Sequence, residues 1–159
     1  MSQSAGRSFL DAGVIIGALS RADARFAESF PIIEAAQRGD FDACTSVGVL
    51  SEVYAALTWT GARPPLSPAA AAQAVIRVVE PPSAIVVLPD GLEAGLRHLE
   101  LAGKNNLTAR RIHDARHAAT ALQNGVSNVY TYDPNDWNDF VADGIVITGP
   151  PSTMARLAP

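Results

Sequence analysis

Short apolar runs alternate along this sequence with longer segments of helical period, and this alternation constrains the fold more than any other feature. Helical segments separate the first four runs. The runs expected to form strands are residues 7–10, 42–46, 85–88, 126–132 and 145–148. Strands that alternate with helices build mostly parallel sheets covered by helices, so the pattern predicts an α/β domain.

Capping and breaking residues indicate where the helices begin and end. Ser67 has the side chain of a helix cap and Pro68 suits a first helical position, so a helix should begin there and end near residue 79. Further helices are expected over residues 14–19, 25–38, 49–60, 91–102 and 108–124. Their expected caps and stops are Gly39, Asp90, Thr108 and Gly125.

Composition indicates one globular domain. The chain has 159 residues, 48% of them hydrophobic and 18% charged, which allows a buried core and argues against disorder. We expect residues 1–150 to form the domain and residues 151–159 to form a loosely attached C-terminal tail. The net charge of −4 disfavours broad electrostatic binding of nucleic acid. Acids gathered around a metal still leave a site that phosphate can approach.

Hydropathy and cysteine content exclude other classes. No run approaches the roughly 20 apolar residues that cross a bilayer, and the polar segment 1–7 does not begin a signal peptide. A cytoplasmic protein without a membrane segment is therefore expected. Cys44 is the single cysteine, so no internal disulfide can form, and its apolar neighbours favour a buried structural thiol over a nucleophile.

Four acidic residues occupy similar places in this plan. Asp11 and Asp133 directly follow the first and fourth expected strands. Glu52 falls in the first turn of the helix after the second strand, and Asp114 lies early in the helix that leads to the fourth. Because the carboxyl ends of parallel strands share one edge of a sheet, where ligands bind, we expect the four acids to converge.

A convergent group of carboxylates requires a cation, since the charges repel one another and raise their own pKa values. Hard oxygen ligands suit Mg²⁺ or Mn²⁺, and the absence of Cys and His partners disfavours zinc. Each acid also has an ordinary structural explanation as a helix cap, a dipole partner, an exposed helical residue or a turn residue. Four such coincidences at one edge favour the metal site, although the residues alone leave both interpretations open.

Four segments resemble the motifs of PIN domains, in the same order and across nearly the whole chain. Residues 9–16 resemble a strand that ends in a metal-binding Asp, and residues 45–53 resemble a strand ending in a hydroxyl residue followed by a helical Glu. Residues 112–122 resemble the third motif, in which an Asp is followed by a helix of small residues. Residues 130–137 resemble the fourth motif, in which an apolar strand is followed by Thr, an acidic residue and an aromatic residue. Chain size and residues 20–39 resemble VapC-type toxins of toxin–antitoxin pairs.

The resemblance implies a three-layer α/β/α fold with a central parallel sheet of about five strands. It implies a Mg²⁺- or Mn²⁺-dependent endoribonuclease that cleaves tRNA, rRNA or mRNA, a small antitoxin as partner, and a homodimer. The acids carried over as catalytic and metal-binding are Asp11, Glu52, Asp114 and Asp133. Asp136 is a fifth ligand or a substitute for Asp133, and Ser46 and Thr131 are the supporting residues. Ala12 and Gly13 depart from the family, where Thr or Ser and Asn are frequent.

Basic residues near Asp114 give a weaker signal. Arg110, Arg116 and Lys104 are the candidates for contact with the RNA backbone, and the alternative is a solvated helix face with ion pairs. Trp137 is expected to be structural.

Two other classes of protein compete with the nuclease. A PIN-like binding or scaffold module that no longer cleaves is the main alternative, and intact acids at all four positions speak against it. A phospho-acceptor receiver domain needs a Lys after a late strand, whereas Lys104 is the only lysine.

Overall fold

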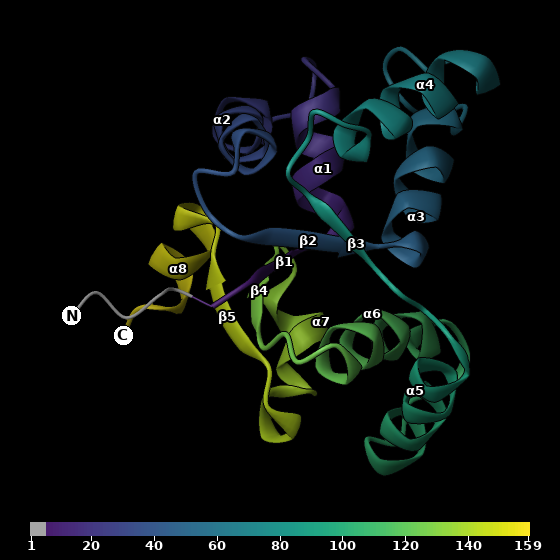
Figure 1. The fold of residues 1–159 in the computed structure, drawn as a ribbon, viewed down its shortest axis with the longest axis vertical. Coiled ribbons are helices and arrows are strands. Elements are labelled where there is room, and N and C mark those ends of the chain that lie inside the picture. The colour runs from purple at the N-terminus through teal and green to yellow at the C-terminus, as the bar shows by residue number, and fades with distance from the viewer. Residues whose placement is uncertain (1–5) are drawn as a thin grey trace.

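A five-stranded parallel sheet forms the centre of the molecule. The computed structural model describes residues 6–159. The strands are β1 (Ser8–Leu10), β2 (Ala43–Ser46), β3 (Val86–Leu88), β4 (Asn128–Tyr130) and β5 (Val146–Gly149). They pair in the order β3-β2-β1-β4-β5, every pair parallel (Figure 1). All five predicted strands are therefore confirmed to within a few residues.

Helices cover both faces of this sheet. The first group is α1 (Ala12–Leu19), α2 (Phe26–Arg38), α3 (Val47–Thr58) and α4 (Pro68–Val79). The second is α5 (Leu92–Lys104), α6 (Ile112–Gln123) and α7 (Pro134–Asn138), with the short turns η1 (Ala109–Arg111) and η2 (Val141–Asp143). The two groups lie on opposite sides of the sheet, and α8 (Pro151–Leu157) lies beside β5 (Figure 1). The predicted three-layer α/β/α fold is confirmed.

The core explains why so much alanine is present. Phe9, Leu10 and Val129 of the two central strands are fully buried, as the pattern of apolar runs predicts. Most buried side chains of α6 are alanines, whose small size allows the helix to approach the sheet closely. These fully buried residues are Ala115, Ala118, Ala119 and Ala121.

The strand order creates one place where a crevice can form. From β1 the chain moves outward through β2 and β3, and it then returns to the other side of β1 to form β4 and β5. The helices that follow β1 and β4 therefore diverge at the carboxyl ends of these neighbouring strands, which is where α/β sheets bind ligands. Asp11 follows β1 here, and Thr131 and Asp133 follow β4.

Local predictions of helix ends were partly right. Ser67 accepts a hydrogen bond from the Ala70 N–H, Pro68 opens α4, and Gly39 ends α2 with φ of 78°, all as predicted. Two predicted caps are wrong. Thr108 makes no side-chain cap, and the Asp90 carboxylate is taken by a tertiary contact with α6 instead of capping α5.

The C-terminal segment is not the loose tail predicted from the sequence. Residues 151–157 form α8, in which Thr153 is fully buried. Ser152 donates from its backbone N–H and its hydroxyl to the Glu28 carboxylate (2.8 and 2.6 Å), which attaches α8 to α2. Predictions made for residues 1–5 lie outside the described residues. Within residues 6–159, no helix is long and apolar enough to cross a membrane.

Candidate active site

Asp11 is the most tightly held of the predicted acids. It ends β1 and is only 7% exposed. Its Oδ1 accepts a hydrogen bond from the Ala12 N–H (2.8 Å), so Asp11 does cap α1. Its Oδ2 accepts bonds from Thr131 Oγ1 (2.7 Å) and Trp137 Nε1 (3.0 Å). Capping and membership of an acidic site are therefore compatible, because the two oxygens have different partners.

Asp114 lies in the first turn of α6 and is surrounded by negative charge. Its pKa is raised from the ordinary value, first by burial and then by the charge of Asp136, with Asp11 adding to the effect against His117 and Arg111. Asp114, Asp136 and Asp11 therefore lie near one another at the β1–β4 crevice. Like charges brought together in this way favour a bound cation.

Asp133 and Asp136 occupy different surroundings, although both follow β4. Asp133 is exposed and its charge acts on Arg25, whose pKa it helps to raise. Asp136 lies one turn later, in α7, and its charge acts on Asp114. Of the two residues that the sequence could not separate, Asp136 is the one whose charge acts on Asp114.

Glu52 is paired with a histidine. It lies in the second turn of α3, not the first as predicted, because α3 begins at Val47. Its Oε2 lies 2.9 Å from Nε2 of His117, and this hydrogen bond lowers the pKa of Glu52, outweighing the opposite effect of burial. The Glu52 side chain is 56% exposed, whereas that of His117 is 9% exposed.

One ring nitrogen of His117 faces Glu52 and the other is enclosed. Because a carboxylate can only accept, Nε2 is the atom that donates to Glu52 Oε2. Nδ1 is buried and has no hydrogen-bond partner within residues 6–159. His117 therefore orients Glu52 through Nε2.

The donor set fits a hard divalent cation by its chemistry. Asp11, Asp114, Asp136 and Glu52 offer carboxylate oxygens. The pKa of Asp114 is raised first by burial and then by the charges of Asp136 and Asp11, and a bound cation would offset both effects. As the side chains lie within residues 6–159, no three acids, histidines or cysteines stand close enough to hold one ion together. Metal binding thus requires side-chain movement, most easily of Glu52 and Asp136, which are exposed.

Hydroxyl residues of the motifs support the backbone around the site. Ser46 accepts a bond from the Val49 N–H and so caps α3, which carries Glu52. Thr45, beside it, donates from Oγ1 to the carbonyl of Leu10 (3.1 Å), immediately before Asp11. Gly13, one of the departures from the family pattern, leaves space that Arg25 fills, since a Cβ there would lie 3.0 Å from Arg25 Nη1.

The three predicted RNA-binding cations differ in availability. Arg116 pairs with Asp90 (Nη2–Oδ2 2.7 Å), and Lys104 pairs with Asp143. Arg110, in η1 just before α6, is exposed and has no ion pair among the described residues. Arg110 is therefore the cation of the three whose charge is not already engaged.

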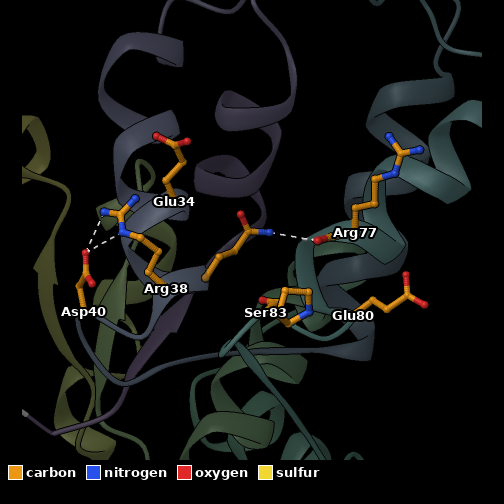
Figure 2. Close-up of a pocket in the computed structure, with 8 residues that line it drawn as sticks. Glu34, Arg38, Asp40, Arg77, Glu80 and Ser83 are labelled. Atoms are coloured by element: carbon orange, nitrogen blue, oxygen red, sulfur yellow. Dashed lines mark hydrogen bonds and ion pairs between the residues drawn. The ribbon is translucent and has the colours of Figure 1, made fainter.

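A separate hollow lies away from the acids, between the ends of α2 and α4 (Figure 2). Arg38 there pairs with Asp40 (2.8 Å), and Gln37 donates to the backbone carbonyl of Arg77 (3.0 Å). Both helices end where the next strand is about to begin, so the hollow lies at the amino edge of the sheet. The acids lie at the carboxyl edge, and this hollow is not part of their site.

Comparison with known proteins assigns the family. The sequence model of the PIN domain matches residues 8–140, which is most of the chain, and the protein belongs to the PIN-domain family. The family indicates a nuclease. Among curated proteins, none is a significant match to the sequence.

Solved structures with the same fold include VapC-type proteins. VapC20 from Mycobacterium tuberculosis, a toxin that cleaves the sarcin-ricin loop, superposes with a TM-score of 0.65 at 22% identity, over 90% of this chain and 99% of that one. VapBC2 from Rickettsia felis, solved with promoter DNA, gives 0.61 at 10% identity (90% and 98%). VapBC-1 from nontypeable Haemophilus influenzae gives 0.58 at 15% identity (88% and 96%). At these identities, the likeness is one of fold.

Two residues that hold the acids, Trp137 and His117, were not predicted in these roles from the sequence. Trp137 was interpreted as structural, yet its indole N–H bonds Asp11. Because the indole N–H of a buried tryptophan needs an acceptor, the prediction that Trp137 is structural already implied a polar partner. His117 follows Asp114 by three residues, and this helical spacing places both on one face. The pairing of His117 with Glu52 joins α6 to α3 and has no local signal.

Proposed function

We propose that this protein is a Mg²⁺- or Mn²⁺-dependent endoribonuclease of the VapC toxin type. The observation that carries the proposal is that Asp11 is held at the β1–β4 crevice by Thr131 and Trp137. Asp114 adds to it, since its pKa is raised by burial and then by the charges of Asp136 and Asp11. Membership of the PIN-domain family supports the same conclusion. Together they favour hydrolysis of a phosphodiester over a purely structural role for the acids.

In this proposal Asp11, Asp114 and Asp136 hold the ion, and Glu52 closes the site from α3. When bound, the ion would supply positive charge to the scissile phosphate and acidify an attacking water. Asp11 is the rigid ligand, since Thr131 and Trp137 fix its carboxylate. Glu52, ionised and oriented by His117, accepts a proton from the attacking water. Arg110 binds the RNA backbone beside the site.

The structural relatives support a substrate class and a partner for this chain. VapC20 is a toxin that cleaves the sarcin-ricin loop, which supports a structured RNA as substrate for this chain. The likeness to VapBC2 and VapBC-1 supports a small antitoxin as partner. A homodimer in the cytoplasm completes the proposal, and light scattering of the purified protein tests the dimer.

Cleavage of RNA by the purified protein tests the activity. Total RNA is incubated with the protein and Mg²⁺, Mn²⁺ or EDTA, beside an Asp11→Asn variant. Asp40→Asn, an exposed acid at the amino edge, is the matched control. We expect discrete fragments that require metal, disappear with Asp11→Asn and persist with Asp40→Asn. Fragments that survive EDTA or Asp11→Asn contradict the proposal.

A non-cleaving scaffold is the second candidate. It is favoured by one observation, that no three ligand residues within the described chain stand close enough to hold an ion as they lie. A folded, antitoxin-free protein that binds RNA but cleaves none with any metal would establish the scaffold.

A further inference from the structure

Helix α8 lies outside residues 8–140, the part of the chain that the PIN-domain model matches, yet its side chains reach the turn after β4. The buried Thr153 Oγ1 donates to the carbonyl of Thr131 (2.8 Å). Arg156 Nη2 donates to the next carbonyl, that of Tyr132 (2.9 Å), and to Thr153 Oγ1 (3.2 Å). Two consecutive carbonyls of this turn are therefore held by α8.

The same turn orients Asp11. The Thr131 hydroxyl donates to Asp11 Oδ2 (2.7 Å) and accepts from the Asp133 N–H (3.0 Å), while the Thr131 N–H donates to the Gly149 carbonyl (2.9 Å). Every polar group of Thr131 is thus engaged. A shift of its backbone moves the hydroxyl that holds Asp11, so the bond from Thr153 reaches Asp11 through one intervening residue.

Other contacts keep α8 and the turn in place together. Glu28 of α2 accepts two hydrogen bonds from Ser152 at the start of α8. Ser29, the next residue of α2, shares a hydrogen bond with the Tyr132 hydroxyl (2.8 Å). Helix α2 therefore forms hydrogen bonds both with α8 and with the turn that α8 contacts, and these bonds fix the position of α8 relative to the turn.

We propose that Thr153 and Arg156 are positioning residues of the acidic site, which hold the Thr131–Tyr132 backbone so that the Thr131 hydroxyl aims Asp11 at the metal. This rests on the proposed function for its effect on cleavage. Its effect on Asp11 does not need cleavage. Residues that orient metal ligands through a hydrogen bond typically change metal affinity or activity by roughly 10- to 100-fold when removed.

The direct readout is the indole N–H of Trp137, which also bonds Asp11 Oδ2. Its proton resonance, distinguished from that of Trp59 with a Trp59→Phe background, reports the Asp11 contact without metal or RNA. Thr153→Val removes the hydroxyl at nearly constant shape, and Thr153→Ser restores it. Thr148→Val is the control, since the Thr148 hydroxyl bonds the Val129 carbonyl (3.4 Å) within the sheet and, among the described residues, bonds neither Asp11 nor the Thr131–Tyr132 turn.

We expect Thr153→Val to shift the Trp137 indole resonance and to weaken Mn²⁺ binding, measured by calorimetry, by roughly tenfold. In RNA cleavage, Thr153→Val should lower kcat and leave KM unchanged. Thr153→Ser should restore the Trp137 resonance, the Mn²⁺ affinity and kcat. Thr148→Val should leave these three quantities unchanged. The milder, exposed Arg156→Gln should move the resonance in the same direction by a smaller amount.

An unchanged Trp137 resonance in folded Thr153→Val overturns the proposal, as does a shift of equal size in Thr148→Val. If Thr153→Val does not fold, the Trp137 resonance of Arg156→Gln becomes the test. An unchanged resonance in Arg156→Gln then overturns the proposal. A parent protein that cleaves no RNA disproves the proposed function alone, because the resonance still tests the path from α8 to Asp11.

Discussion

Both edges of the sheet carry charged side chains, but these side chains have different partners at the two edges. At the amino edge, the hollow between α2 and α4 mixes acids with arginines, and Asp40 pairs with Arg38 on an exposed surface (Figure 2). At the carboxyl edge, Asp114 lies among Asp136 and Asp11, and its pKa is raised. An ion pair at an exposed surface contributes little to stability, whereas titratable groups with shifted pKa values gather at functional sites.

The largest expected effect comes from removing an acid at the carboxyl edge. Asp11→Asn and Asp114→Asn should each reduce RNA cleavage by roughly 100-fold or more, because each removes a ligand charge from the metal. Asp40→Asn should stay within about twofold, since its pair with Arg38 is a surface contact. Initial rates at saturating Mn²⁺ measure this, and equal losses at both edges would remove the distinction between them.

The next comparison separates two acids of one turn. Asp136→Asn should reduce cleavage by roughly tenfold or more, because Asp136 is the neighbour of Asp114, whereas exposed Asp133→Asn should have an effect of about threefold or less. Asp136→Asn should also lower the pKa of Asp114, which carboxyl-carbon NMR measures. A larger loss of cleavage with Asp133→Asn than with Asp136→Asn would show that Asp133, and not Asp136, is the metal ligand.

A smaller effect is expected from the support of Glu52. His117→Gln should reduce cleavage by roughly three- to tenfold and raise the pKa of Glu52 toward its ordinary value, because the hydrogen bond that lowers it is lost. The acidic limb of the pH–rate profile should then move to higher pH. In Glu52→Gln, adding His117→Gln should change nothing further, and an additive loss would show that His117 acts elsewhere.

The smallest expected effect concerns stability without metal. Because the pKa of Asp114 is raised in the folded state, the folded protein binds this proton more tightly, and its ionisation costs stability as pH rises through that pKa. Asp114→Asn should therefore raise the melting temperature in EDTA at neutral pH by about 2 °C, and the gain should disappear at acidic pH. Mg²⁺ should stabilise the parent more than the variant. A lower melting temperature for Asp114→Asn in EDTA would contradict the repulsion.

Local patterns were sufficient where a short range of residues decides the outcome. The strands, Ser67 and Pro68 at the start of α4, and Gly39 at the end of α2 were predicted from neighbours in the chain. Cys44 was predicted to be a buried thiol, and burial in β2 raises its pKa to about 12. The caps failed where a distant residue competed, since Asp90 bonds Arg116 and not the start of α5.

By itself, the sequence determined the α/β architecture and supplied the acids that are candidates for the site, because apolar period and motif order are local properties. Tertiary structure alone decided that the charge of Asp136 acts on Asp114, that His117 bonds Glu52 and that α8 bonds the turn behind Asp11. The physical reason is that a hydrogen bond between residues far apart in the chain depends on how the elements pack. No pattern within one segment encodes that packing.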